Sequence, residues 1–311
     1  MQLGDECMRV AAIDCGTNSI RLLIADIDGN SFREIYRTME IVRLGQGVDQ
    51  NKSFHPDAIA RTLAAVDEFA QEISRRGVEK IRFCATSATR DATNRELFIN
   101  GVKDRLGIEP EVISGEEEAK LSFIGATKEF AASDAPFLVV DIGGGSTEFV
   151  YGSADVEFAK SVNIGCVRMT ERNIHSDPPA PEEIENARKD IQEAIAIAAA
   201  IVPITRAKTI IAVAGTATSV AASALGLEQY DRHQIHLARV SADQTHLVAT
   251  TFARMNAEER SHIGFLHPGR ADVFAAGSLV LSEILKATGA SEFIASEADI
   301  LDGIAWSLAR N

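Results

Sequence analysis

The sequence predicts an α/β protein made of two similar halves. Segments with strand patterns and segments with helix patterns alternate along most of the chain, which is typical of α/β folds. A turn rich in glycine and small polar residues occurs twice, within residues 12–23 and 140–151, and an apolar strand flanks it on both sides each time. With 311 residues, the chain is long enough for two domains.

The first half predicts strands at residues 9–27, interrupted by a short loop, and a further strand at 31–43. Residues 56–76 predict a helix, because apolar side chains recur there at helical spacing. A strand at 80–87, a helix from about residue 88, a strand at 110–114 and a helix at about 115–130 follow. The segment 133–136 predicts a seam between the two domains.

The second half repeats this plan. Residues 137–153 predict strand, glycine loop and strand, and residues 182–202 predict a helix with one apolar stripe. Residues 209–225 predict a strand, a loop and a helix. The remainder predicts mainly helix, including the last segment of the chain.

Composition excludes several classes of protein. The formal net charge is −14, which disfavours general binding to nucleic acids or anionic membranes. No apolar run is long enough to cross a membrane, and acidic residues stand where a signal peptide would be basic, so we expect a cytoplasmic protein. The cysteines are scattered without metal or disulfide spacing, which predicts reduced thiols. No histidine is assigned to catalysis.

The two turns align in register. When Asp14 is set against Asp141, Gly16 meets Gly143 and Ser19 meets Ser146, and the two segments lie 127 residues apart. The sequence therefore predicts two related hairpins, each with an aspartate at the end of its first strand. Internal repetition of this kind indicates duplicated architecture.

Three consecutive glycines allow a backbone turn to place N–H groups around an anion. We expect Gly143, Gly144 and Gly145 to hold a phosphate, with Ser146 and Thr147 adding hydroxyl donors. Asp14 and Asp141 would face the same cleft, where two carboxylates beside a phosphate favour Mg²⁺. A strand follows each turn, which excludes Walker A and dinucleotide-binding loops. The alternative is a glycine-rich hairpin without a ligand.

Three further segments carry candidate residues. Arg90 lies in the first turn of the predicted helix that follows residues 80–87, where the macrodipole does not favour a cation, so we expect it to contact phosphate or to pair with a nearby carboxylate. Ser114 and Glu117 form a capping-box pattern, and one of Glu116, Glu117 and Glu118 could be catalytic. Glu148 points either into the cleft or to solvent. The turns at 163–172 and 214–222 suit phosphate binding or helix capping.

Eight segments, in order, resemble the exopolyphosphatase and guanosine pentaphosphate phosphatase (Ppx/GppA) family of the actin, Hsp70 and sugar kinase superfamily. They include DCGTNSIRLL, ATSATRDATN, ISGEEEAKLSFIG, VVDIGGGSTEFV and SEADILDGIA. The resemblance implies two actin-like (ribonuclease H-like) domains with mixed sheets flanked by helices and an active site in the interdomain cleft. It implies residues 1–128 with the C-terminal helix at about 297–311 in one domain, and 129–296 in the other.

The resemblance also implies hydrolysis of a terminal phosphoanhydride with Mg²⁺ or Mn²⁺. Glu118 would accept a proton from the attacking water, and Glu148 would help to place water or metal. The implied metal-binding residues are Asp14, Asp141 and Glu148. The implied phosphate contacts are Thr17, Asn18, Ser19, Arg90, Gly143, Gly144, Gly145, Ser146 and Thr147.

The substrate that we expect is inorganic polyphosphate, with guanosine pentaphosphate, a nucleotide of the stringent response, as the alternative. A non-catalytic nucleotide-binding regulator of the actin and Hsp70 type, or a sugar or acetate kinase, would be a different class of function. The resemblance is compatible with a homodimer. Two positions depart from the family pattern: Lys120 stands where Arg is common, and Ala214 stands where a second glycine is usual. The chain resembles the short, two-domain form of the family.

Overall fold

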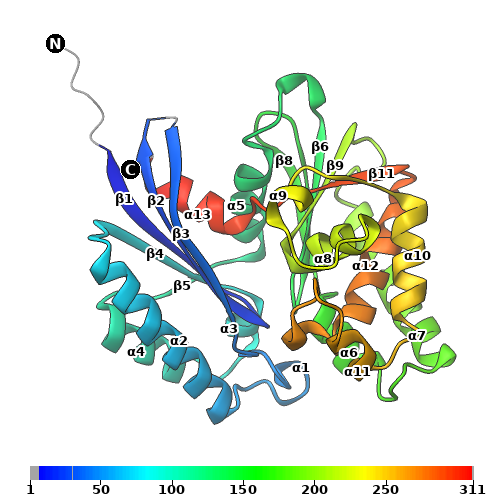
Figure 1. Cartoon of the computed structure of the whole chain (residues 1–311), viewed down its shortest axis with the longest axis horizontal. Helices are drawn as coiled ribbons and strands as arrows, with labels where there is room; N and C mark the ends of the chain where they lie inside the picture. The colour runs from blue at the N-terminus through cyan, green and yellow to red at the C-terminus, as the bar shows by residue number, and fades with distance from the viewer. Residues whose placement is uncertain (1–6, 30, 310–311) are drawn as a thin grey trace. The chain divides into compact units, whose positions relative to one another are not determined.

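The computed structural model describes residues 7–29 and 31–309, and the chain divides into two compact units (Figure 1). Unit 1 contains the chain up to Gly125 together with the segment from Ile300 onward. Unit 2 contains Ala126–Asp299. The last helix therefore belongs to the same unit as the first strands, although the whole of unit 2 separates them in the sequence.

Unit 1 is built on a five-stranded mixed sheet with the order β3-β2-β1-β4-β5. The first three strands are antiparallel neighbours, whereas β4 and β5 run parallel to β1. The strands are β1 (Met8–Cys15), β2 (Ser19–Asp28), β3 (Ser31–Ile41), β4 (Lys80–Ala85) and β5 (Glu111–Val112).

Helices cover both faces of this sheet. Successive side chains of a strand point to opposite faces, so Ala11 and Ile13 of β1 join one core and Val10 and Ala12 join another. The first core packs against α2 and α4, and the second packs against α13. The helices of this unit are α1 (Val48–Asn51), α2 (Pro56–Arg75), α3 (Ser87–Asp91), α4 (Arg95–Leu106), α5 (Gly115–Thr127, its last two residues in unit 2) and α13 (Ile300–Ala309).

Unit 2 has a six-stranded mixed sheet with the order β10-β11-β9-β6-β7-β8. Its first three strands again form antiparallel pairs, and β9 and then β11 continue the sheet parallel to β6. The strands are β6 (Phe137–Ile142), β7 (Thr147–Gly152), β8 (Val156–Val162), β9 (Thr209–Val213), β10 (Arg239–Ser241) and β11 (Glu292–Ala295). The predicted α/β class with mixed sheets and helices is confirmed, and both units share one strand order apart from β10.

One continuous apolar core joins this sheet to its helices, with Leu138 and Val140 of β6 packed among residues of α7, α8 and α12. The helices are α6 (Cys166–Asn173), α7 (Pro181–Ala199), α8 (Ala214–Ala224), α9 (Arg232–Ile235), α10 (Ala242–Phe252), α11 (Ala257–Ser261) and α12 (Phe274–Thr288). Short 3₁₀ turns occur at Ala132–Asp134 and Pro268–Arg270.

Several sequence predictions of local structure were wrong or incomplete. The sequence predicted no strand at β8, and it predicted mainly helix across the region that contains β10 and β11. These strands are three to seven residues long, and a pattern of period two cannot be recognised reliably over so few residues. The helix expected from about residue 88 is two helices, α3 and α4, because the backbone at Ala92 is extended.

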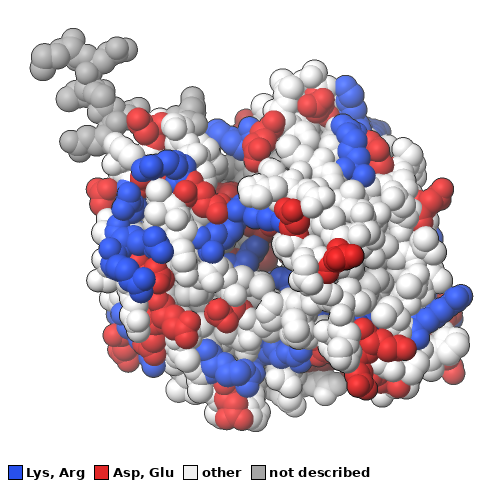
Figure 2. All heavy atoms as spheres, viewed as in Figure 1, with Lys and Arg blue, Asp and Glu red and all other residues white. Residues whose placement is uncertain are grey.

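The surface and the thiols agree with the composition. Figure 2 shows acidic and basic side chains interspersed over the visible face of each unit. All four cysteines are free thiols, and Cys15, Cys84 and Cys166 are buried. Among residues 7–29 and 31–309, no helix combines the length and apolar character needed to cross a lipid bilayer.

Candidate active site

The glycine loop of unit 2 connects β6 to β7 and is closed by a hydrogen bond from the Gly143 N–H to the Ser146 carbonyl at 3.0 Å. Its carbonyl groups are held by α6. Gly143 accepts from Cys166 N–H at 3.0 Å, and Gly144 accepts from the N–H groups of Val167 and Arg168 at 2.9 and 3.0 Å. The buried Arg168 side chain donates through Nε to the Gly145 carbonyl at 2.7 Å.

These contacts determine where the loop amides point. In a trans peptide the C=O and the following N–H point in opposite directions. Because the carbonyls of residues 143–145 face α6, the N–H groups of Gly144, Gly145 and Ser146 face away from it. Three successive N–H groups on one side of a turn form a nest for an anion. The loop geometry therefore suits an anion, and the binding of phosphate here stays a prediction.

Gly165 makes this close packing against α6 sterically feasible. A Cβ at this position would lie 2.3 Å from the carbonyl carbon and oxygen of Gly144. Such a contact is far shorter than any ordinary separation, so a side chain here would push the loop away. The shape of this loop thus depends on a glycine that lies outside the triple-glycine sequence.

The corresponding loop of unit 1 connects β1 to β2 and closes in the same way, with Gly16 N–H donating to the Ser19 carbonyl at 2.9 Å. The segment after β3 holds its carbonyls: Thr17 accepts from Gly45 at 2.8 Å, and Asn18 accepts from Val42 and Arg43 at 3.0 and 2.8 Å. By the same peptide geometry, the N–H groups of Asn18 and Ser19 face away from that segment.

The Thr17 hydroxyl adds a second observation in this loop. Its Oγ1 atom is buried and makes no hydrogen bond with any part of the chain that the structure describes. A buried hydroxyl in this state costs free energy unless a ligand or water satisfies it. Thr17 and Asn18 are both almost fully buried, so their polar atoms are confined to this loop.

The aspartates of the two hairpins have different partners. Asp14 lies opposite Arg21 across β1 and β2, and the Arg21 guanidinium donates to Asp14 Oδ2 from Nη2 at 2.6 Å and from Nε at 3.0 Å. Asp141 lies opposite Glu148 across β6 and β7, and both carboxylates are buried, with 5% and 1% of their surface exposed. Arg21 and Glu148 occupy equivalent positions, since each follows its aspartate by seven residues.

Two buried carboxylates opposite each other are unfavourable unless positive charge is brought near them. Mg²⁺ prefers oxygen ligands and commonly uses one or two carboxylates together with water and substrate phosphates. The pair of Asp141 and Glu148 fits this requirement, and Ser161 orients Glu148 by donating to Oε1 at 2.7 Å. Asp14 fits it less well, because Arg21 already balances its charge. Among the described residues, no group of three or more potential metal ligands is found.

The three glutamates at the start of α5 differ in their exposure and in their partners. Glu116 is exposed, Glu117 is half-buried and pairs with Arg82, and Glu118 is buried. Arg90 Nη1 donates to Glu118 Oε2 at 2.7 Å and to the Ile113 carbonyl at 2.9 Å. The Ser114 hydroxyl accepts from the Glu117 N–H at 3.2 Å, which is half of the predicted capping box. Glu118 alone of the three is buried beside a predicted phosphate ligand.

The protonation of Glu118 is set by opposing influences. Burial raises the pKa of its carboxyl above the usual value of 4.5, and the negative charge of Asp14 acts in the same direction. Arg90 lowers this pKa through its charge and its hydrogen bond, and the Thr86 hydroxyl lowers it as well. The net shift is upward, toward the range in which a carboxylate is an effective general base.

One argument from sequence was wrong. Arg90 was expected at the start of a helix, where a cation is unfavourable, but α3 has only five residues and Arg90 lies in its last turn. The negative end of the helix macrodipole therefore favours the positive charge of Arg90 at this position. The pairing with a nearby carboxylate, which the sequence analysis kept as the alternative, is present, and the carboxylate is Glu118.

Each unit thus gathers one set of the predicted residues. Unit 1 holds Asp14, Thr17, Asn18, Ser19, Arg90 and Glu118, and unit 2 holds Asp141, Glu148 and the loop Gly143–Thr147. Sequence reasoning missed the contributions of Arg21, Ser161, Gly165 and Arg168. Of these, Arg21 could have been found, because the alignment of the two turns places it against Glu148.

The chain belongs to the Ppx/GppA phosphatase family. The sequence model of this family matches residues 23–311. Exopolyphosphatase 2 of Mycobacterium tuberculosis is 45% identical over 314 residues, covering 97% of this chain and 98% of that protein. A crystal structure of an exopolyphosphatase-like protein matches with a TM-score of 0.95 and 43% identity, covering 98% of both chains. The Aquifex aeolicus PPX-GPPA enzyme matches with a TM-score of 0.80 and 30% identity, covering 96% of this chain and 99% of that chain.

These similarities confirm the family resemblance drawn from the sequence motifs. They also agree with the predicted enzyme class, a hydrolase that acts on phosphoric anhydrides. Because the similarity covers nearly the full length of the chain, it includes both units and both loops.

Proposed function

We propose that the protein is an exopolyphosphatase that releases orthophosphate from the end of inorganic polyphosphate. The observation that carries this proposal is Glu118, a buried carboxylate of raised pKa held by Arg90, in a chain similar along its whole length to an exopolyphosphatase. The two amide-lined loops supply the phosphate-binding groups that such a reaction requires.

In the proposed reaction, ionised Glu118 accepts a proton from a water molecule as the water oxygen attacks the terminal phosphorus. A new P–O bond forms, the bridging P–O bond breaks, and its electron pair leaves with the shortened chain. Arg90 balances the charge of Glu118 before the reaction and lies within reach of the phosphoryl oxygens that gain charge during it. Positioning and charge stabilisation account for most catalysis of this type.

The loop residues bind the phosphates. The N–H groups of Gly144, Gly145 and Ser146 donate to phosphate oxygens, and the hydroxyls of Ser146 and Thr147 lie beside them. Gly143 closes this loop. Asn18 and Ser19 donate through their N–H groups, and the buried Thr17 hydroxyl gains a partner when phosphate is bound. Each of these groups is neutral, so the charge of the substrate must also be balanced by cations.

Mg²⁺ or Mn²⁺ would be held by Asp141 and Glu148, with Asp14 as a further candidate ligand. When bound, the ion supplies positive charge that neutralises phosphate oxygens and offsets the repulsion between the two carboxylates. Ser161 contributes by fixing the orientation of Glu148. Asp14 is better suited to holding Arg21 than to direct coordination, because its Oδ2 atom accepts two hydrogen bonds from that side chain.

We also propose a cytoplasmic location, which the free thiols support, since disulfides are rare in that compartment. The proposed domains are residues 1–128 with about 297–311, and residues 129–296. A homodimer is proposed from the family resemblance alone, and sedimentation of the purified protein would test it.

The substrate is tested by measuring orthophosphate release by the purified protein with Mg²⁺ on long-chain polyphosphate, guanosine pentaphosphate and ATP. We expect the highest kcat/KM on polyphosphate. A preference for guanosine pentaphosphate would identify the alternative phosphatase. Tight binding of ATP without release from any substrate would identify a nucleotide-binding regulator, and transfer to an added acceptor would identify a kinase.

A further inference from the structure

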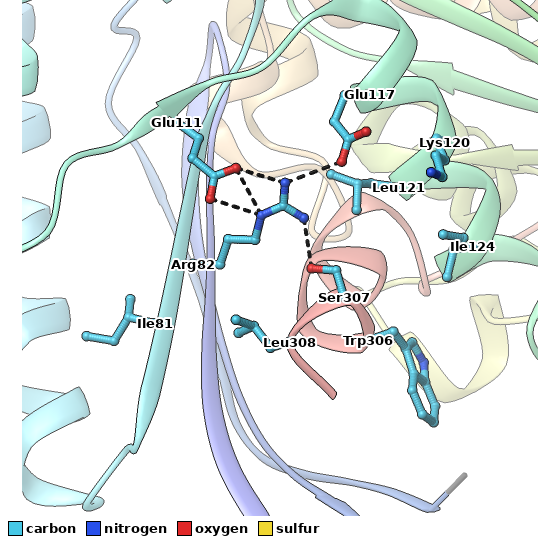
Figure 3. A pocket seen from close by; sticks show the side chains of 10 residues that line it. All are labelled: Ile81, Arg82, Glu111, Glu117, Lys120, Leu121, Ile124, Trp306, Ser307 and Leu308. Atoms are coloured by element: carbon cyan, nitrogen blue, oxygen red, sulfur yellow. Dashed lines mark hydrogen bonds and ion pairs between the residues drawn. The ribbon is translucent and has the colours of Figure 1, made fainter. Parts of the chain in front are cut away.

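A cavity of about 510 Å³ lies beside α5 within unit 1 (Figure 3). Four of its lining residues, Glu117, Lys120, Leu121 and Ile124, are spaced at three, four and seven positions along α5 and therefore share one face of that helix. The opposite walls come from β4, β5 and α13. The start of α5, which carries Glu118, therefore borders a hollow on this side, whereas Leu121, one turn further on, packs in the core with α13.

Among the contacts that hold this face of α5 in place, two concern the turn that carries Glu118. The first is at Leu121, where α13 approaches so closely that a Cβ on Gly303 would lie 2.0 Å from the Leu121 carbonyl oxygen. The second is at Glu117, one helical turn nearer to the beginning of α5, where the carboxylate pairs with Arg82. Glu118 lies between these two points.

Arg82 is placed to act as a clamp. Its guanidinium donates to Glu117 Oε1 at 3.3 Å, to Glu111 Oε2 at 2.8 Å and, through Nη1, to the Ser307 hydroxyl at 2.8 Å. Figure 3 shows these side chains converging on the one guanidinium from three different elements. Only 16% of the Arg82 side chain is exposed, whereas the carboxylates of Glu111 and Glu117 are 51% and 39% exposed, so solvent screens these ion pairs in part.

The first turn of α5 is thus held by two arginines acting on neighbouring glutamates. Arg82 of β4 holds Glu117, and Arg90 of α3 holds Glu118. We propose that Arg82 is a positioning residue for Glu118, acting through Glu117 to fix the first turn of α5 against β4. The consequence for catalysis rests on the proposed function, because it requires Glu118 to be the general base.

The clamp requires a planar, multidentate cation. Lysine has a single ammonium group on a flexible stem and cannot reproduce the forked geometry that joins Glu111, Glu117 and Ser307. Lysine does keep the positive charge, so we expect the kcat of Arg82→Lys to lie between those of wild type and Arg82→Gln. Glu117→Gln removes the same ion pair from the other side and should give the same defect as Arg82→Gln.

Loosening the first turn should lower kcat more than it changes KM. A displacement of about 1 Å at a catalytic group can reduce the rate up to a hundredfold. For the loss of one half-buried ion pair we expect a smaller effect, a decrease in kcat of about tenfold with KM changed by less than about twofold.

The pH dependence provides a readout that a merely structural role would not change. The groups that face Glu118 are Arg90, Asp14 and Thr86, and Arg82 is not among them. If Glu118 loses part of its contact with Arg90 when the turn loosens, its carboxyl protonates more readily. The acid limb of the kcat profile should then move to higher pH in Arg82→Gln.

The experiment compares wild type, Arg82→Gln, Arg82→Lys and Glu117→Gln in orthophosphate release and in hydrogen exchange of the backbone amides at 117–119. Ser307→Ala removes one Arg82 partner without touching α5, and it should give the same defect to a smaller extent. Arg105→Gln removes a different ion pair of unit 1, to Asp67 at 2.9 Å, and controls for the loss of surface charge. Emission of Trp306, the single tryptophan, shows whether the cavity wall keeps its packing.

The inference predicts faster amide exchange at 117–119 and lower kcat in Arg82→Gln and Glu117→Gln, partial recovery in Arg82→Lys, a smaller defect in Ser307→Ala, and no change in the Arg105→Gln control. Exchange that stays at the wild-type rate in both variants would overturn it. If wild type releases no orthophosphate from any substrate, the proposed function fails, and the exchange rates alone still decide whether Arg82 fixes the turn.

Discussion

The two hairpins, residues 14–21 and 141–148, have the same backbone plan and different chemistry. Both close with a hydrogen bond from a glycine N–H to a serine carbonyl three residues later. In both, a segment that follows later in the chain holds the loop carbonyls, so that several N–H groups face away from it. The residue opposite the aspartate differs: it is Arg21 in the first hairpin and Glu148 in the second.

This single difference separates the two roles that we propose. Arg21 balances the charge of Asp14, so the first hairpin needs no bound cation to be stable. Glu148 adds a second buried carboxylate to Asp141, and we propose that a cation binds at the second hairpin. The two hairpins thus share one backbone plan and differ in the charge that lies opposite the aspartate.

The largest expected effect comes from making the second hairpin resemble the first. Glu148→Arg would pair Asp141 with a guanidinium and remove the need for a metal, and we expect activity to fall by at least about a hundredfold. Orthophosphate release across a Mg²⁺ titration measures this effect.

Glu148→Gln is the companion variant for Glu148→Arg, in case the larger side chain prevents folding. Circular dichroism and thermal unfolding would confirm that each variant folds. Wild-type activity and unchanged Mg²⁺ dependence in both folded variants would contradict the proposal that Asp141 and Glu148 bind a metal ion.

The next prediction concerns the segments that hold the loops. Gly165→Ala would place a Cβ 2.3 Å from Gly144, whereas Gly16→Ala would place one 3.6 Å from the Ser19 carbonyl oxygen, which is an ordinary contact. We expect Gly165→Ala to raise KM by about tenfold and to lower the free energy of unfolding by about 1–3 kcal/mol. Gly16→Ala should have a clearly smaller effect on both. Equal effects in steady-state kinetics and urea unfolding would show that steric support from α6 is not what shapes the second loop.

A smaller effect is expected in the pH profile. Burial of Glu118 raises the pKa of its carboxyl, and a general base must be ionised, so the acid limb of kcat should have its midpoint above pH 4.5. Arg90 lowers this pKa, and Arg90→Gln should therefore move the limb to still higher pH. The kcat of wild type and variant is measured between about pH 4 and 9 at saturating substrate. A limb that moves to lower pH in the variant would contradict the assignment of Glu118.

The smallest effect is expected at a third turn, between β9 and α8. Ala214 has a φ of 65°, in the left-handed region that favours glycine. Ala214→Gly should raise the free energy of unfolding by about 0.5–1 kcal/mol. The backbone strain that is relieved in the folded state should exceed the additional conformational entropy that glycine loses on folding. Thermal unfolding checks this, and Ala224→Gly, within the same helix, should instead be destabilising.

Much of the fold could be predicted because its signals are strong and local. The apolar spacing of α2 and α7 and the paired Asp-x-Gly turns gave the class and the duplication. The turns at 14–21 and 141–148 fell where they were expected, since glycine and small polar residues define such turns within a few positions. The roles given to the site residues and the exact domain boundaries stay predictions.

The rest depends on contacts between distant parts of the sequence. The identity of the buried glutamate in α5 required Arg90, which lies 28 residues away, and the shape of the second loop required Gly165 and Arg168. Periodicity and turn propensity report only on neighbours along the chain, so they cannot reveal such partners. The short strands β10 and β11 were missed for a related reason, because their pairing partners define them.

The central claim is that Glu118 is the base for hydrolysis of a terminal phosphoanhydride. The most direct test is the rate of orthophosphate release from long-chain polyphosphate with Mg²⁺, compared between wild type and Glu118→Gln. We predict release by wild type and a loss of at least about 10²-fold in the variant, with polyphosphate binding retained. Equal rates in the two proteins would contradict the claim.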